Sequence, residues 1–352
     1  MAKIFIVDDS RIIRKVLTST LKEAGHEVIG VTLRTTDSSY EKNQLDEIAD
    51  ARETADILGI QYHTVDVMSE FKCDVVKHFV NEYISGRTPN PCVVCNTSVK
   101  WQGLIDYADL INYDFVATGH YAEVLKLDNK RFALKQLDNN EKDQTYMLYR
   151  LTQDQLKRTY MPLYNKTKPE VRSIAEKIGL KVFDKPDSQE ICFVPDGKYP
   201  EFVENFANGY KSIPGDFVDE DGNYLGKHKG IIHYTVGQRK GLGIAMGYPV
   251  FVKEIRPDTN EIVLAEEESL LTNRIYVRDI CFMGLFPMSE GEKVECFVKI
   301  RYHHKKQKAN VTFRDNGFLI EFEEPVRAAS PGQSAVLYDD KGFLLGGGII
   351  DK

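Results

Sequence analysis

Short apolar runs alternate with longer amphipathic stretches through the first third of the chain. The amphipathic stretches, such as Leu45–Leu58 and Val75–Ile84, place apolar residues at helical spacing. The apolar runs have the length of strands, and they are Ile4–Val7, Val28–Leu33, Tyr62–Val65 and Phe115–Thr118. Strands that alternate with helices predict βαβ units, and therefore an α/β fold with a Rossmann-like parallel sheet.

The pattern changes twice towards the C-terminus. Residues 142–206 are mainly helical in spacing, which predicts a helical extension of the first domain. After Ile213-Pro214-Gly215 the chain turns to short β-rich runs with turn signals such as Asp315-Asn316-Gly317. We therefore expect an α/β domain over residues 1–208, a small central domain over 209–272, and an antiparallel β-barrel over 273–352.

The composition is that of an ordinary folded protein. Apolar residues make up 42% and charged residues 28% of the chain, which argues against long disorder and a collagen-like class. No run approaches the roughly 18 apolar residues of a membrane-spanning helix. For this reason we expect no membrane partner. Six cysteines are too few for a disulfide framework, so we expect a cytoplasmic protein. Because the net charge is −7, any polyanionic partner must be bound by local basic patches.

Two cysteines stand in polar segments. Cys95 follows Gly86-Arg87-Thr88-Pro89-Asn90-Pro91-Cys92-Val93-Val94, whose two spaced prolines favour a stiff, extended loop. The C-x-x-C spacing is also half of a zinc site, but the sequence offers no second C-x-x-C and no H-x-x-x-H. Cys192 lies in Asp187–Phe193, where a single cysteine beside Ile and Phe is more often a small buried hydrophobe. The two together favour thiol chemistry such as persulfide transfer, which needs one sulfur to deliver and another to resolve.

Two basic islands interrupt this acidic chain. Lys299–Lys308 holds five cations, two histidines and no acid, with Tyr302 among them. Lys227–Lys240 holds four cations and no acid. Such islands are suited to phosphate and, with an aromatic ring, to an unpaired base, although an ordinary charged surface gives the same pattern.

Taken together, these segments resemble the tRNA-specific 2-thiouridylase family. From about residue 26 onward the chain has the family's motifs in order, namely Gly86–Asn96, Ala117–Tyr121, Lys142–Tyr146, Asp187–Phe193, His233–Gly243, Arg301-Tyr302 and Ser330–Ser334. The resemblance implies an adenine nucleotide alpha hydrolase-like first domain and sulfuration of the wobble uridine of tRNA at C2. It implies ATP, with Mg²⁺, to adenylate the uracil oxygen, and a protein that donates persulfide sulfur.

The resemblance also assigns roles by position. Cys95 becomes the nucleophile and Cys192 the persulfide carrier, with a transient disulfide between them. This division agrees with chemistry, because the uracil oxygen leaves readily only after adenylation, and a thiolate or persulfide is nucleophilic near neutral pH. Leu33 and Gly119 are the implied nucleotide-pocket residues, and no metal ligand is assigned. The implied tRNA contacts are Asn90, Pro91, Cys92, His120, Lys142, Asp143, Gln144, Arg301, Tyr302 and Gln333.

Some of these assignments have alternatives. Many members of the family have Asp where this chain has Cys92, so a carboxylate role is not carried over. Lys142–Gln144 is equally a solvated turn, and His233 and Tyr234 are equally satisfied barrel positions.

The chain departs from the family at its start. The family opens with a Ser-Gly-Gly-x-Asp-Ser loop after the first strand, whereas here the strand is followed by Asp8-Asp9-Ser10-Arg11 and the first glycine is Gly25. Without glycine, the backbone is poorly suited to wrap its N–H groups around phosphates. Ile4–Val28 instead resembles the start of a response-regulator receiver domain, whose acidic pair binds magnesium. Ser10 can still donate a hydrogen bond to a phosphate, and Asp8 or Asp9 can still bind Mg²⁺.

Three functions follow from the sequence. The first is an ATP-dependent tRNA 2-thiouridylase. The second, motivated by the glycine-free opening, is a catalytically silent tRNA-binding or sulfur-acceptor protein. A third, phosphorelay signalling, rests only on Val7–Arg11.

Overall fold

A computed structural model describes residues 2–7, 21, 25–36, 41–137, 142–177, 191–194, 198–207 and 209–351. The chain forms two compact units. Unit 1 comprises residues 1–75, 92–189 and 342–344, and unit 2 comprises 76–91, 190–341 and 345–352. The domain boundaries expected near residues 208 and 272 stay a prediction.

Unit 1 is built on a parallel sheet with the strand order β3-β2-β1-β4-β7. Its strands are β1 (Lys3–Val7), β2 (Glu27–Arg34), β3 (Gln61–Asp66), β4 (Phe115–Thr118) and β7 (Thr159–Tyr160). Phe5 and Ile6 of the central strand β1 are fully buried, as expected for a strand covered on both faces. The predicted Rossmann-like parallel sheet is confirmed. The opening segment supplies its central strand even though it departs from the family motif.

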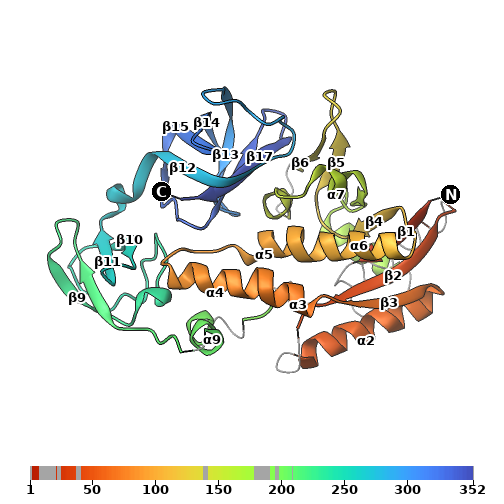
Figure 1. Cartoon of the computed structure of the whole chain (residues 1–352), viewed down its shortest axis with the longest axis horizontal. Helices are drawn as coiled ribbons and strands as arrows, with labels where there is room; N and C mark the ends of the chain where they lie inside the picture. The colour runs from red at the N-terminus through yellow and green to blue at the C-terminus, as the bar shows by residue number, and fades with distance from the viewer. Residues whose placement is uncertain are drawn as a thin grey trace. The chain divides into compact units, whose positions relative to one another are not determined.

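Helices connect these strands. Helix α2 (Glu41–Leu58) contacts β2 and β3 (Figure 1). A continuous helical stretch is formed by α5 (Pro91–Val94), the π-helix η2 (Cys95–Trp101) and α6 (Gln102–Leu110). The remaining described elements of unit 1 are α3 (Met68–Glu70), most of the π-helix η1 (Phe71–Val76), the hairpin β5 (Glu123–Lys126) and β6 (Phe132–Lys135), η3 (Thr145–Leu148), α7 (Gln153–Lys157) and α8 (Lys168–Lys177).

Unit 2 contains a four-stranded sheet in the order β10-β11-β8-β9. These strands are β8 (Gly215–Val218), β9 (Tyr224–His228), β10 (Phe251–Arg256) and β11 (Glu261–Ala265). Tyr234 is buried, and its ring meets Phe217 edge-on at 5.2 Å between centroids. Tyr234 is therefore a core residue of this sheet. Short helices of unit 2 are α4 (Lys77–Ile84), α9 (Tyr199–Phe206), η5 (Ile231–His233) and η6 (Glu267–Leu270).

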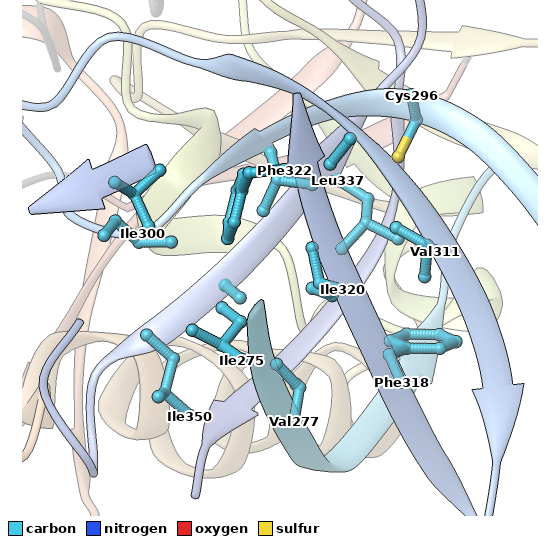
Figure 2. Packing of buried hydrophobic residues seen from close by; sticks show 14 of the residues in the cluster. Ile275, Val277, Cys296, Ile300, Val311, Phe318, Ile320, Phe322, Leu337 and Ile350 are labelled. Atoms are coloured by element: carbon cyan, nitrogen blue, oxygen red, sulfur yellow. The ribbon is translucent and has the colours of Figure 1, made fainter. Parts of the chain in front are cut away.

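The C-terminal strands form a closed barrel in the order β12-β15-β14-β13-β16-β17. The strands are β12 (Leu271–Phe282), β13 (Lys293–Lys299), β14 (Gln307–Arg314), β15 (Gly317–Arg327), β16 (Ser334–Tyr338) and β17 (Leu344–Ile350). Alternate apolar side chains such as Val277, Val311 and Ile320 fill its interior (Figure 2). Asp315 and Asn316 adopt positive φ in the tight turn between β14 and β15, as their position before Gly317 predicts. The expected antiparallel barrel is confirmed.

Candidate functional site

The carboxyl edge of the unit 1 sheet has the topology of a nucleotide site. The chain places β2 and β3 on one side of β1 and β4 and β7 on the other, so the strand order reverses between β1 and β4. Ligands of open α/β sheets bind in the crevice outside the strand ends at such a point. The end of β1, Val7, is in register with Val31 of β2 and Thr118 of β4.

The predicted nucleotide residues flank this point. Leu33 lies two residues beyond Val31 on β2, and Gly119 follows Thr118 directly. The structure therefore brings both to the edge where β1 ends. The loop Asp8–Arg11, to which the sequence assigned possible phosphate and Mg²⁺ ligands, lies outside the described residues.

His120 is held beside this edge. Its Nδ1 lies 3.0 Å from the Thr118 hydroxyl, and its ring packs at 5.1 Å against the indole of Trp101. Trp101 is itself fully buried and donates its indole N–H to the Thr159 hydroxyl at 2.7 Å. His120 is thus placed between the end of β4 and the helix that carries Cys95.

Cys95 begins the π-helix η2 and is 7% exposed. The residues that follow it are tied to the rest of unit 1: the Asn96 side-chain amide donates to the Met147 carbonyl at 3.1 Å, and the Thr97 carbonyl accepts from Gln155 Nε2 at 3.1 Å. Gln155 in turn completes a reciprocal capping box with Thr152 at the start of α7. These bonds fix the backbone that presents the thiol.

Cys92 lies one helical turn before Cys95 and is exposed. Although Cys92 is exposed, the protein atoms around its thiol partly desolvate it and so raise its pKa, and the positive charge of Lys100 partly offsets this shift. Cys92 and Cys95 therefore differ in access to solvent although they share one helical segment.

The segment Lys142–Gln144 divides into one exposed and two anchored side chains. Lys142 is exposed. Asp143 is 7% exposed and accepts hydrogen bonds from the backbone N–H groups of Leu137 and Thr145 at 3.0 and 3.3 Å. Gln144 exchanges two hydrogen bonds with the backbone of Tyr121 at 2.9 and 3.0 Å. A purely solvated turn, one of the two interpretations of the sequence, does not describe this segment.

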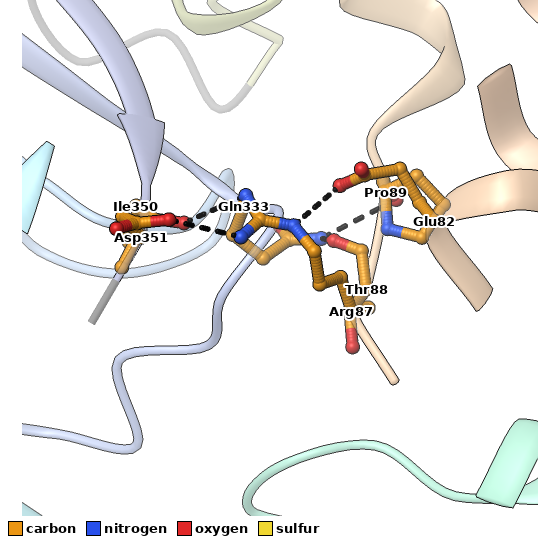
Figure 3. A network of polar contacts seen from close by, with 7 residues as sticks. All are labelled: Glu82, Arg87, Thr88, Pro89, Gln333, Ile350 and Asp351. Carbon is orange, nitrogen blue, oxygen red and sulfur yellow. Dashed lines mark hydrogen bonds and ion pairs between the residues drawn. The ribbon is translucent and has the colours of Figure 1, made fainter. Parts of the chain in front are cut away.

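In unit 2, the loop before Asn90 and Pro91 is fastened to the barrel (Figure 3). Arg87 forms ion pairs with Glu82 at 2.9 Å and Asp351 at 3.2 Å, and it donates to the Ile350 carbonyl. Gln333 donates its side-chain N–H to the Thr88 carbonyl at 2.9 Å. The loop is therefore held by the barrel as well as by its prolines.

Gly332 allows this close approach. Its φ is +91°, and a Cβ atom there would lie 2.8 Å from the Thr88 carbonyl oxygen and 2.9 Å from the Thr88 nitrogen. The Thr88 N–H donates to the carbonyl of the neighbouring Pro331 at 2.8 Å. The motif Ser330–Ser334 thus serves as a support for the loop.

Arg301 is bonded within unit 2. One of its terminal nitrogens donates to the carbonyls of Val236 and Ala328, at 3.0 and 2.7 Å, and to the Ser330 hydroxyl at 2.6 Å. The Lys299 ammonium lies over the Tyr302 ring, 5.4 Å from the ring centroid, in a cation–π contact. A direct tRNA contact by Arg301 and Gln333 remains a prediction, but both side chains have structural bonds that the sequence did not indicate.

The basic island Lys299–Lys308 is less uniform in space than in sequence. Lys308 pairs with Glu295 at 2.7 Å and Glu323 at 2.8 Å, and these carboxylates raise its pKa. These glutamates lie on neighbouring barrel strands, so folding places acidic side chains beside a run that has none in its own sequence. Of the other cations in this run, Lys305 is exposed.

Cys192 is exposed in unit 2, whereas the next residue, Phe193, is 3% exposed. The Phe193 ring meets Phe79 edge-on at 5.2 Å and Phe202 at 5.4 Å, which fastens this turn to α4 and α9. The alternative of Cys192 as a buried hydrophobe is wrong, because Cys192 is exposed and the buried side chain of this turn is that of Phe193. Residues 187–190 of the motif lie outside the described part of the chain.

All six cysteines are free thiols. Among the described residues, no three His, Cys, Asp or Glu side chains gather in a way that would hold a metal ion. None of the helices in the described ranges is both long and apolar enough to cross a membrane.

The sequence matches three family descriptions in succession. Residues 9–196 match a tRNA methyl transferase HUP domain, residues 201–266 a tRNA methyl transferase PRC-barrel domain, and residues 272–350 an aminomethyltransferase β-barrel domain.

Similar proteins extend over nearly the whole chain. A protein of Lachnoclostridium phytofermentans named tRNA-specific 2-thiouridylase MnmA is 48% identical, and the match covers 100% of both chains. A Clostridium botulinum protein named tRNA-specific 2-thiouridylase MnmA 1 is 44% identical, and the match covers 94% of this chain and 94% of that protein. A Clostridium perfringens protein named tRNA-specific 2-thiouridylase MnmA is also 44% identical, and the match covers 94% of this chain and 93% of that protein.

Proposed function

This chain belongs to the tRNA-specific 2-thiouridylase family, and on that premise we propose that it transfers sulfur to C2 of the wobble uridine of tRNA. The observation that carries the proposal is 48% identity to a 2-thiouridylase over the full length of both chains. A tRNA sulfurtransferase is therefore favoured over a silent tRNA-binding or sulfur-acceptor protein.

We propose that ATP binds at the carboxyl edge of the unit 1 sheet. The reversal of strand order between β1 and β4 supports this position, and Gly119 lacks a side chain that would hinder a close approach there. Leu33 offers an apolar contact on the neighbouring strand. ATP supplies the adenylyl group that turns the uracil oxygen into a leaving group, and Mg²⁺ accompanies the phosphates.

Sulfur transfer then uses the two cysteines. The terminal sulfur of a persulfide on Cys192 bonds to C2 as AMP leaves. The Cys95 thiolate attacks the Cys192 sulfur, and the bond to the transferred sulfur breaks with its electron pair remaining on the new 2-thiouridine. A disulfide between Cys95 and Cys192 is the second product. The exposure of Cys192 suits loading by a sulfur-donor protein, and the anchored helix of Cys95 suits a nucleophile of fixed position.

The tRNA contacts are proposed with two different roles. His120, Lys142, Tyr302, Asn90, Pro91 and Cys92 are proposed to face the anticodon stem-loop. Asp143, Gln144, Arg301 and Gln333 are proposed mainly to position the segments that do so, because their side chains bond to neighbouring protein groups.

The experiment combines purified protein, ATP, a persulfide donor and tRNA with an unmodified wobble uridine, and it measures 2-thiouridine by nucleoside mass spectrometry. We expect product only with ATP, and none from Cys95→Ser or Cys192→Ser. Cys281→Ser, at a partly exposed barrel position, is the matched control and should retain activity. Undiminished activity in either active-site variant would refute the cysteine assignment. Calorimetric titration that finds tRNA binding but no ATP binding would favour the silent protein instead.

A further inference from the structure

A second thiol lies on the same helical segment as the proposed nucleophile. Cys92 belongs to α5 and Cys95 to the first position of η2, three residues apart in a continuous helical stretch. Side chains at this spacing lie on one face of a helix, about 5–6 Å apart at Cβ. A disulfide needs Cα atoms about 4.4–6.8 Å apart and Cβ atoms about 3.5–4.5 Å apart. The spacing along the helix therefore suits a bond at the backbone, and the two Cβ atoms have to move about 1–2 Å closer to form it.

We propose that Cys92 is a resolving thiol that regenerates the sulfur carrier after each turnover. This rests on the proposed function, which leaves a disulfide between Cys95 and Cys192. The Cys92 thiolate attacks the Cys95 sulfur, the bond from Cys95 to Cys192 breaks, and Cys192 leaves as a thiolate that takes the proton lost by Cys92. The products are a Cys92–Cys95 disulfide and a free Cys192, so no oxidant is consumed. A dithiol reductant then reduces the Cys92–Cys95 disulfide and is itself oxidised to a disulfide.

The two thiols differ in their access to solvent, and this difference suits different roles. Cys92 is exposed, which gives a reductant access to the helical disulfide, whereas Cys95 is 7% exposed. Desolvation raises the pKa of the Cys92 thiol, and the positive charge of Lys100 partly offsets this shift. The adjustment is confined to one helical turn, directly before the segment that Asn96 and Thr97 anchor.

The first test needs no catalysis. The full-length protein is equilibrated in buffers of reduced and oxidised glutathione, unreacted thiols are alkylated, and tryptic peptides are analysed by mass spectrometry. Cys92 and Cys95 fall on one peptide, residues 88–100, which becomes lighter by two hydrogens when they pair. The paired peptide therefore carries no alkyl group and is two hydrogens lighter than the unmodified dithiol peptide. We expect this form in the wild-type protein and in Cys73→Ser, an exposed-cysteine control in the same unit, and none in Cys92→Ser. Its absence from the wild-type protein at every glutathione ratio would overturn the proposal.

The second test follows turnover. In Cys92→Ser, the rounds of 2-thiouridine formation after the first should be about tenfold slower than the first round of the same variant, with the Cys95–Cys192 disulfide accumulating. Wild-type protein sampled under limiting reductant should instead contain the Cys92–Cys95 disulfide and free Cys192. Equal multiple-turnover rates for wild type and Cys92→Ser would overturn the proposal. A wild-type protein that makes no 2-thiouridine would refute the proposed function, and the glutathione titration would still decide whether the pair forms.

Discussion

Gly332→Ala should damage the support of the Gly86–Pro91 loop in a way that can be separated from the ordinary cost of losing a glycine. Gly332 adopts a φ of +91°, and an added Cβ would lie 2.8–3.0 Å from three backbone atoms of Thr88. Backbone atoms cannot move aside as a flexible side chain can. The alanine therefore has to push the loop away from the barrel.

The magnitude has two parts. A left-handed backbone at a non-glycine residue costs about 1–2 kcal/mol. Forcing extra atoms into a packed contact costs about a further 1–3 kcal/mol. Gly291→Ala is the matched control, because Gly291 has a similar φ of +80° and no heavy atom within 4 Å of the added Cβ. Only the first part applies to it.

Urea denaturation measured by circular dichroism should show a larger loss of stability for Gly332→Ala than for Gly291→Ala. Gly332→Ala should also lower the rate of 2-thiouridine formation, because the displaced loop carries Asn90 and Pro91. Equal losses of stability and equal activities in the two variants would show that the contact with Thr88 does not support the loop.

Two further predictions follow. Gln155→Ala removes the capping-box partner of Thr152 and leaves the Thr97 carbonyl without its side-chain donor, so the free energy of unfolding should fall by about 2–4 kcal/mol. The control Lys157→Ala, at an exposed position of the same helix, should change the free energy of unfolding by less than about 0.5 kcal/mol. Similar losses of stability in the two variants would contradict the anchoring role of Gln155. His228 is buried, accepts from the Gly230 N–H at Nδ1 and lies 3.1 Å from the Asn260 carbonyl at Nε2; burial lowers its pKa. The unfolded chain then binds the extra proton more readily, so the stability that His228 contributes above about pH 6.5 is lost as the pH falls through its lowered pKa. Melting temperatures at several pH values should decline less steeply on acidification for His228→Gln, and parallel declines would refute the assignment.

The sheet of unit 1 was predictable because its strands are continuous apolar runs, a pattern typical of buried parallel strands. The barrel was predictable because turn residues such as Asp315 and Asn316 mark the strand ends. Both signals are local in sequence.

The supports of the site were not predictable in the same way. Gln333 bonds to Thr88 across 245 positions, and Arg301 bonds to Val236 across 65. Either side chain looks like a free polar group in the sequence. The Lys308 pairing with Glu295 and Glu323 similarly depends on which strands become neighbours. The pattern Thr152-x-x-Gln155 fits a capping box and is a local signal for part of this support, although none of the predictions from the sequence used it.

The most direct test of the sulfur-transfer account follows the sulfur atom itself. Cys192 is loaded with an isotopically labelled persulfide, excess donor is removed, and ATP and tRNA are added for a single turnover. The account predicts labelled 2-thiouridine from the wild-type protein and none from Cys192→Ser treated in the same way. Labelled product from Cys192→Ser, or unlabelled tRNA from a loaded wild-type protein that binds both ATP and tRNA, would contradict it.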